Sequence, residues 1–427
     1  MIRLILKNLW ARRRRNIWLF GELILVSILT WIMVDPMVVM TYNRNLPLGY
    51  DTNGLYMLNL GTIPLQSADD DEEEDDSIHR MNNLFRILDD VRRYEGVQSA
   101  TPVVSFSYPN SPGTYGNTLK YDSLSVGVRG MFFLPHTCFF ETYGIKGLGG
   151  HTARQLDERD YEQNDIICTQ NMSDQFFPGM ELTGKKLYSS YISDTIPYRV
   201  VGVVDNIRYR SFEQPLPVFF KVMDADDDDN DPADSKIVFR LQEGISESRF
   251  LHEFRSYMTT HLKFGNLFVR SVVSYDDHIK DMEYGYGVTN TYRMNTVLCL
   301  FFLINLVLGV TGTFWLQTRS RCEEVGVMLS YGANPSHIIR MLLGEGAVLA
   351  TIAVVIGCFI YLQYGLSEGL YTMGEPFGNY WINDFTYHFV AVSVIVYIVI
   401  VAVVLLGVYI PARKISRILP TEALRDE

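Results

Sequence analysis

Cysteine is scarce in this sequence, with five residues among 427, and no two of them are spaced as a CxxC pair. A cysteine-rich zinc site therefore has no support. Cys138 and Cys168 fall in the polar middle of the chain, where one disulfide or two free buried thiols agree equally well with the sequence. The eight histidines are scattered, and neither HExxH nor GxSxG is present. We therefore predict no catalytic site, no metal and no cofactor, and we interpret the histidines and carboxylates as surface residues.

Positive charge is also in short supply, because the formal net charge is −12. A nucleic-acid-binding protein needs a basic footprint, so that class of protein is excluded. The acidic residues gather in two runs, Asp69–Asp76 and Asp224–Asp234. Neither run has the glycine turn and the distal glutamate of an EF-hand, which argues against calcium binding. We interpret both runs as solvated, mobile loops that are dispensable for folding.

A phosphate loop is nearly matched but incomplete. Residues Gly179–Lys185 fit GxxxxGK, yet Lys186 stands where the motif requires Ser or Thr for magnesium. The segment also precedes strand-like residues instead of opening a helix. We therefore reject a nucleotide site here.

Long apolar runs, in contrast, are abundant. Spans of about 20 residues can cross a membrane as helices, and the sequence predicts four of them, at residues 17–40, 291–318, 341–366 and 387–411. The first is the weakest, since it contains Glu22 and Asp35-Pro36, which we place near the membrane interfaces. A basic start precedes this span but no small-residue cleavage site follows it, so we predict a retained anchor and not a cleavable signal.

Basic residues near the spans set the predicted orientation. They precede the first span, lie between the second and third, and follow the fourth, whereas residues 367–386 contain no Lys or Arg. By the positive-inside rule, both termini, the loop 319–340 and the tail 412–427 face the cytoplasm, and residues 41–290 lie outside it. The sequence thus predicts a multi-pass protein of the cytoplasmic (inner) membrane, in contact with lipid.

The first residues, 1–16, are predicted to form a small amphipathic helix. Their apolar side chains share one face, with basic residues beside it: Ile2, Ile5, Leu6 and Leu9. Such a helix can lie on the inner membrane surface, and the basic residues serve equally as a topology signal.

The outer segment has the mixed pattern of an α+β domain. Strand-like runs include Gly54–Leu60, Tyr198–Asp205 and Lys236–Leu241, and helical spacing marks Ile78–Tyr94 and Ser246–Lys263. The polar stretch 276–295 can lead helically into the second span as a stalk. The predicted fold class is therefore a membrane protein with four transmembrane α-helices and a large α+β extracytoplasmic domain inserted between the first and second.

Two acids lie inside predicted spans, Glu22 and Glu345, and ionisable groups in such places are often functional. We interpret both first as interface residues with local partners. Glu345 follows Arg340 by about one helical turn, and Glu22 stands close to Arg12–Arg15.

Three stretches carry a family resemblance. Thr318–Ala333 reads TRSRCEEVGVMLSYGA, the end of the chain reads PAR and then PTEALR, and Asp165–Asp205 has strand-like runs around FPG and GK. They resemble the MacB/FtsX family of ABC-transporter permeases, whose loop after span two is close to R-x-R-E-I-G-I-x-R-A-L-G-A; Ser330 and Tyr331 depart from it. The third stretch is similar to the periplasmic core domain of that family, which implies that the glycines of the near phosphate loop form a turn before a strand.

The resemblance implies a MacB-like periplasmic core domain with a stalk at residues 41–290, and a cytoplasmic loop that couples to a separate ABC ATPase. Residues 323–329 can form a short helix that Gly332 ends, and Pro335 can start the next one. Glu324 would meet a basic residue of the ATPase, and Val325, Val327 and Met328 would offer apolar area. Alternatively, Glu323 and Glu324 merely pair with Arg319 and Arg321 at the surface. The predicted coupling residues are Arg321, Glu323, Glu324, Val325, Gly326, Val327, Met328, Gly332 and Ala333.

Members of this family pair as dimers and transmit ATP-driven motion through the stalk. The resemblance therefore implies a non-catalytic permease subunit, in a homodimer or a heterodimer with a related permease, that serves export, lipoprotein handling or antimicrobial-peptide resistance. Periplasmic or outer-membrane components are further expected partners. An FtsX-type regulator of an extracytoplasmic cell-wall hydrolase is the alternative, although the outer domain is large for it. A membrane sensor without an ATPase is a third, and the coupling loop argues against it.

Overall fold

The computed structural model describes residues 13–64, 66–68, 70–74, 76–104, 106–180, 182–190, 197–223, 234–319, 321–367 and 385–417. Four predicted features lie wholly or largely outside these residues: the N-terminal amphipathic helix, the second acidic run, the loop 367–386 and the closing motif Pro420–Arg425. The chain divides into two compact units, Met1–Tyr42 with Asn290–Glu427, and Asn43–Thr289.

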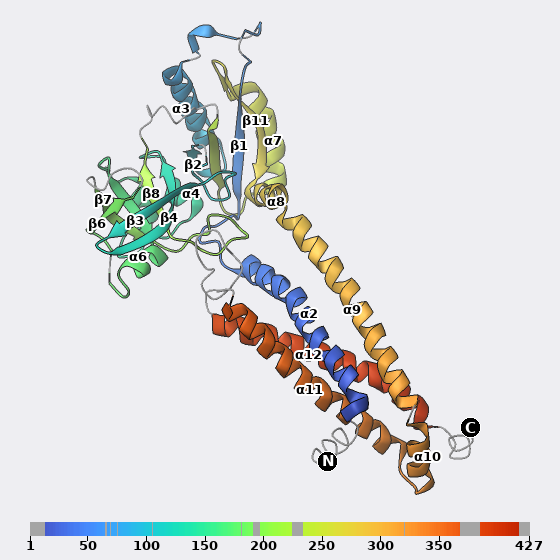
Figure 1. Ribbon diagram of the computed structural model, residues 1–427. Coiled ribbons are helices and arrows are strands. Elements are labelled where there is room, and N and C mark those ends of the chain that lie inside the picture. Colours follow the sequence, from blue (N-terminus) through green and yellow to red (C-terminus); the bar gives the residue numbers. More distant parts are fainter. Residues whose placement is uncertain are drawn as a thin grey trace. The chain divides into compact units, whose positions relative to one another are not determined.

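In the described part of the chain, four helices are long and apolar enough to cross a membrane (Figure 1): α2 (Arg13–Asn45), α9 (Val288–Arg319), α11 (Pro335–Ser367) and α12 (Phe385–Ile415). A short helix, α10 (Cys322–Ser330), lies between α9 and α11 in the sequence. The predicted fold class, four transmembrane helices with a large α+β domain between the first and second, is confirmed.

Glycines allow close approaches between the membrane helices. A Cβ on Gly357 of α11 would lie 1.7 Å from Ser27 Oγ of α2, and one on Gly407 of α12 would lie 3.2 Å from Thr311 Oγ1 of α9. Small residues at such positions let helix backbones approach, which increases the dispersion contacts that hold membrane helices together. The four helices consequently share one apolar core, which includes Leu23, Val310, Ala350 and Val404.

One lobe of the outer unit is a five-stranded antiparallel sheet in the order β10-β11-β1-β9-β2 (Figure 1). Its strands are β1 (Leu55–Thr62), β2 (Val97–Val103), β9 (Lys236–Leu241), β10 (Lys263–Phe264) and β11 (Leu267–Ser274). Two helices, α3 (Ser77–Arg93) and α7 (Glu247–His261), pack on one face, where Leu84, Leu88 and Phe254 join Phe239 in a buried core. The predicted strands and helices of this lobe are thus present.

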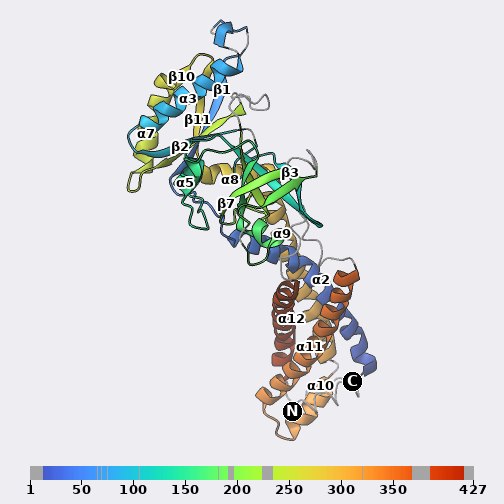
Figure 2. The ribbon, with the colours of Figure 1, turned by 90° about the vertical axis from the view of Figure 1, so that its left-hand side faces the viewer.

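The other lobe is a closed barrel whose residues lie between β2 and β9 in the sequence, with strand order β3-β4-β8-β5-β7-β6. Figure 2 shows it around β3 and β7. Its strands are β3 (Tyr115–Tyr121), β4 (Leu124–Phe133), β5 (Asp165–Thr169), β6 (Lys186–Ser189), β7 (Pro197–Val204) and β8 (Val218–Val222), and its helices are α4 (Phe139–Tyr143), α5 (Ala153–Asp157) and α6 (Gln170–Phe176). A second buried core, with Met57, Phe140, Val201 and Phe220, contains residues of both lobes. Gly184 has φ +83° in the turn before β6, as the family resemblance implied for the glycines of the near phosphate loop.

The stalk is not one continuous helix. α8 (Tyr275–Gly285) ends before Gly287, which has φ +72°, and α9 begins at Val288. Glycine tolerates this left-handed conformation, so the sequence permits a break here. Tyr275 and His278 are buried in the outer unit, so α8 belongs to the folded domain.

In its described part the first acidic run makes specific hydrogen bonds, which its interpretation as a solvated loop did not include. Asp76 caps α3 by accepting a hydrogen bond from His79 N at 2.8 Å. Buried Asn266 donates to Asp70 Oδ1 at 2.9 Å, and its own Oδ1 accepts from Asp71 N at 3.0 Å. Aspartate side chains accept hydrogen bonds from backbone N–H groups at helix starts and in turns. A count of the charges in the run does not reveal this role.

Several titratable residues predicted at the surface are buried. Each of them has a hydrogen-bond or ion-pair partner that the sequence does not reveal. The residues are Asp35, Asp157, Asp165, Glu213, Glu283, Glu345, His278 and His388. Cys138 and Cys168 are both free thiols, and Cys168 is buried whereas Cys138 is half-buried. Among the described residues, no group of three or more His, Cys, Asp or Glu is placed to hold a metal ion.

Candidate functional site

The helix α10 is fixed at its end by a glycine cap. Gly332 has φ +87°, and its N–H donates to Leu329 O at 3.0 Å, while Ala333 N donates to Met328 O at 3.0 Å. These two bonds form a Schellman motif, in which glycine follows the last helical turn and satisfies free carbonyls. The predicted short helix ended by Gly332 is therefore present, one residue longer at each end than expected.

The next helix begins two residues later. Asn334 Oδ1 accepts from Ser336 N at 3.0 Å, and Pro335 is the first residue of α11. Proline fits a first helical turn because its N–H is not needed there. The connection between α10 and α11 is consequently short and has defined caps on both sides.

The inner face of α10 packs onto the membrane helices. Val325 is 2% exposed and lies in the same apolar core as Ile338 of α11 and Ala412 of α12. Cys322, Leu329 and Ala333 pack against that core. Val325 therefore offers no area for docking, contrary to the prediction, because the helix turns this side chain inward.

The outer face of α10 combines apolar and acidic side chains. Val327 is 43% exposed, Met328 is 39% exposed and Tyr331, just after the helix, is 89% exposed. Glu323 and Glu324 are also exposed. Sequence reasoning missed Tyr331, which departs from the family pattern. An apolar patch with an acidic rim is typical of a surface that binds a partner with basic residues.

A buried ion pair ties the start of α10 to α11. Arg321 is the residue before the first helical residue, Cys322, and its Nη1 contacts Glu345 Oε2. Both residues are buried, at 7% and 5% exposure. The predicted pairing of Glu345 with Arg340 is wrong, because Arg340 Nε donates to Ser336 O at 3.2 Å and its side chain is exposed. Arg321 contacts Glu345 instead of the proposed surface partners Glu323 and Glu324. The side chain of Arg319, their other proposed partner, lies outside the described set.

Glu22 is the second predicted in-membrane acid, and it is half-buried in α2. Its Oε1 lies near α9, 3.9 Å from where a Cβ on Gly309 would stand. The predicted partners Arg12–Arg15 have side chains outside the described set. Within that set, Glu22 Oε2 is buried without a hydrogen-bond partner.

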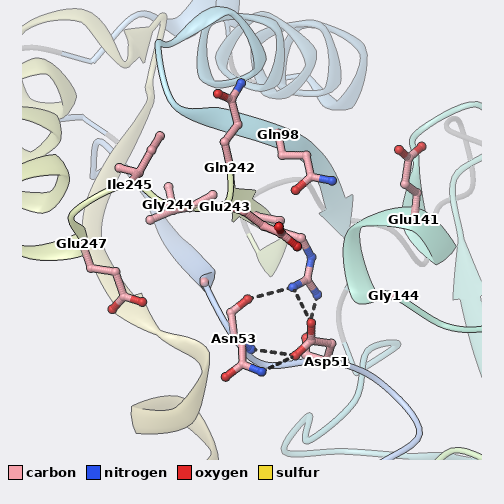
Figure 3. A pocket seen from close by; sticks show the side chains of 13 residues that line it. Asp51, Asn53, Gln98, Glu141, Gly144, Gln242, Glu243, Gly244, Ile245 and Glu247 are labelled. Atoms are coloured by element: carbon pink, nitrogen blue, oxygen red, sulfur yellow. Dashed lines mark hydrogen bonds and ion pairs between the residues drawn. The ribbon is translucent and has the colours of Figure 1, made fainter.

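The outer unit contains a polar pocket of about 390 Å³ beside the start of β1 (Figure 3). Arg240 lines the pocket and donates to Asp51 Oδ2 at 3.1 Å, to Asn53 O at 2.7 Å and to Thr142 O at 2.9 Å. Asp51 and Asn53 lie together at one end of the pocket, and Glu141 lies apart from them (Figure 3). The guanidinium joins the beginning of β1 to α4, so we assign Arg240 a structural role.

Comparison with known proteins places the C-terminal part of the chain. Residues 296–420 match the family described as FtsX-like permease C-terminal. The chain is 29% identical over 138 residues to the ABC transporter permease YtrF of Bacillus subtilis, covering 30% of this chain and 31% of YtrF. It is 23% identical over 368 residues to the macrolide export ATP-binding/permease protein MacB 2 of Aeromonas hydrophila, covering 83% of this chain and 50% of that protein.

A MacB of Bartonella quintana is 22% identical over 335 residues, which cover 77% of this chain and 46% of that protein. The chain thus spans about half the length of the MacB relatives it matches. Among solved structures, the periplasmic region of MacB from Actinobacillus actinomycetemcomitans aligns with 55% of this chain and 94% of that region, at TM-score 0.31 and 14% identity. A domain of a permease protein from Porphyromonas gingivalis aligns with 53% of this chain and 92% of that domain, at TM-score 0.33 and 14% identity.

Proposed function

Since this chain belongs to the MacB/FtsX-type family of ABC-transporter permeases, we propose that it is a non-catalytic subunit that couples a separate cytoplasmic ATPase to motion of its outer domain. In this proposal both termini and the loop 319–340 face the cytoplasm, and residues 41–290 lie outside it. The permease works as a homodimer or with a related permease, surrounded by lipid. Export, lipoprotein handling and antimicrobial-peptide resistance are the processes it would serve, with periplasmic or outer-membrane components as partners.

The geometry of α10 is the observation that carries this proposal. One face is held by the Arg321–Glu345 pair and by Val325 in the bundle core, while the other presents Val327, Met328 and Tyr331. A force applied to the exposed face is therefore transmitted directly to the membrane helices, because packed protein interiors are displaced with little compression. Glu323 and Glu324 at the rim favour an ATPase surface that carries basic residues.

The test replaces the exposed apolar side chain at the centre of this face. Met328→Glu should abolish co-purification with the ABC ATPase that a pull-down with the wild-type chain identifies, and remove stimulation of its ATP hydrolysis. Met180→Glu provides a matched control, since Met180 is 62% exposed on the outer unit. Both variants should insert and unfold like wild type. Unchanged ATPase binding and stimulation with Met328→Glu would overturn the proposed coupling site.

A further inference from the structure

Tyr331 has the most exposed large apolar side chain among the described residues, at 89% exposure. Its backbone N–H donates to Val327 O at 3.1 Å, but within the described part of the chain its ring has no hydrogen-bonding or stacking partner. Single exposed apolar residues are common on protein surfaces. The case for a role of Tyr331 therefore depends on what holds it and what lies beside it.

The backbone of Tyr331 is held on both sides by residues that pack onto the membrane helices. Leu329 and Ala333 pack against the apolar core of the bundle. Gly332 N donates to Leu329 O at 3.0 Å, and Ala333 N donates to Met328 O at 3.0 Å, so the glycine cap closes around Tyr331. The side chain therefore extends from a fixed backbone, and only its two χ torsions are left to be ordered on binding.

The neighbours of Tyr331 on the helix define one side of α10. Residues four apart lie on the same side of a helix, so Glu323, Val327 and Tyr331 form one row. All three are exposed, whereas Val325 is buried in the bundle core. The row therefore points away from the membrane helices, and it combines a carboxylate, a branched apolar side chain and an aromatic ring.

This combination favours a protein partner over lipid. A tyrosine near a membrane surface can lie among lipid headgroups, but the cytoplasmic leaflet is negatively charged and attracts basic side chains. The Glu323 carboxylate in the same row is repelled by such a surface. A protein surface with an apolar pocket and a basic residue at its rim complements both the ring and the carboxylate.

We infer that Tyr331 is the side chain that determines how tightly the ATPase binds, by inserting its ring into an apolar pocket with a basic rim on the ATPase. The inference rests on the proposed function, since it names the anchor of the same coupling site. A ring on a fixed backbone buries a large apolar area and loses little conformational entropy, which is why tyrosine is enriched among residues that dominate binding. The MacB/FtsX pattern has leucine in this position, so the ring is a feature of this chain.

The first test measures the affinity of the full chain, in lipid nanodiscs, for the ABC ATPase that a pull-down with the wild-type chain identifies. Tyr331→Ala should weaken binding by about 30-fold or more, the loss typical of a side chain that dominates an interface. Tyr331→Phe keeps the ring and should lose about tenfold at most. Tyr284→Ala, the matched control, removes an exposed tyrosine of the outer unit and should bind like wild type.

The same variants separate anchoring from transmission of force. An anchor contributes affinity, so Tyr331→Ala should regain wild-type stimulation of ATP hydrolysis when the ATPase is present at saturating concentration. It should also unfold in detergent at the wild-type temperature, because the ring is exposed. Stimulation still lost at saturation, or a lower unfolding temperature, would overturn the inference, since Tyr331 would then act in transmission or in the fold.

Hydroxyl-radical footprinting of the wild-type chain in nanodiscs identifies what covers the ring. Tyr331 should be oxidised without the ATPase and protected when the ATPase is bound. Met180, which is exposed on the outer unit, should react equally in both samples. Protection of Tyr331 before any ATPase is added would assign the ring to lipid or to another part of this chain, and would overturn the inference.

The outcome for the proposed function is separate. If Met328→Glu abolishes ATPase binding while Tyr331→Ala binds like wild type, the role of Tyr331 is overturned and the proposed function stands. A wild-type chain that captures no ABC ATPase would overturn the proposed function, and the role of Tyr331 with it.

Discussion

Asp35 of α2 and His388 of α12 stand 353 positions apart in the sequence and touch within the helix bundle, with Asp35 Oδ1 2.5 Å from His388 Nε2. Both residues are 0% exposed. Trp31 of α2 stacks on Tyr361 of α11, with ring centroids 3.9 Å apart, and its Nε1 donates to Ser393 Oγ of α12 at 3.2 Å. Polar and aromatic contacts therefore hold α2 against α11 and α12 at the same level of the bundle.

Replacing either member of this pair should destabilise the bundle strongly. Asp35→Ala or His388→Ala leaves one buried polar partner behind, and breaking a buried pair from one side typically costs about 3–5 kcal/mol. The double variant should cost less than the sum of the two single variants, because the residues are in contact. Unfolding in detergent, followed by the near-ultraviolet signal of the tryptophans, measures all three. Strictly additive losses would show that the two side chains act independently.

The first acidic run should contribute measurably to folding. Asp76→Ala removes the cap of α3, so the first turn of that helix should be less stable. The effect should appear as faster hydrogen exchange in the first turn of α3. Glu73→Ala is the comparison, since Glu73 lies in the same run and, among the described residues, its hydrogen bond runs from the backbone N–H to Asp71 Oδ1 and does not use the side chain. Equal hydrogen-exchange rates in the first turn of α3 in the two variants would show that the run behaves as a solvated loop.

Local patterns in the sequence predicted the membrane spans, the strands β1 and β9, the helix α3 and the glycine-ended helix α10. Each depends on periodicity or capping within a few residues. The partners of Glu345 and Asp35 were not predictable in this way, because Arg321 is 24 positions from Glu345 and His388 is 353 from Asp35. The barrel was missed for a related reason. Its closure depends on β4 pairing with β8 and β3 with β6, and no local signal encodes those distant pairs.

Acid should destabilise the outer unit through His278. Burial lowers the pKa of His278 from its ordinary 6.5 to about 4, and the Lys236 ammonium acts in the same direction. Between these two values the unfolded chain binds a proton that the folded chain does not, so the free energy of unfolding falls as pH falls. From pH 7 to pH 4 the wild type should lose up to about 3 kcal/mol relative to His278→Gln, at about 1.4 kcal/mol per pKa unit.

The comparison with His278→Gln is necessary because protonation of Asp157 changes the free energy of unfolding in the opposite direction. Burial raises the pKa of Asp157 to about 6, against the opposing effect of the amide groups of Glu141 and Phe140. The folded chain therefore holds this proton more tightly, and acid stabilises it. Hydrogen exchange of α8 in the full chain, measured across this pH range, isolates the histidine as the difference between wild type and variant. Parallel pH curves would show that His278 does not titrate in the predicted way.

The pair Arg321–Glu345 should be required for coupling, although neither residue is exposed for contact with an ATPase. Glu345→Ala removes the acceptor that holds Arg321 at the start of α10, so that the helix keeps its outer face and loses its rigid attachment to α11. We expect the ATPase still to bind, with faster hydrogen exchange in α10 and with loss of stimulated ATP hydrolysis. Co-purification, exchange and hydrolysis measured on one preparation check the three parts of this result.

Arg340→Gln is the matched control for that variant. Arg340 is exposed near the start of α11 and donates to Ser336 O within its own helix, so its loss leaves the Arg321 contact in place. It should retain wild-type exchange and stimulation. If Glu345→Ala also stimulates the ATPase fully, then α10 transmits force through its apolar packing alone, by way of Val325 and its neighbours. If Glu345→Ala fails to bind the ATPase at all, the pair shapes the docking face itself, and rigid attachment is not its role.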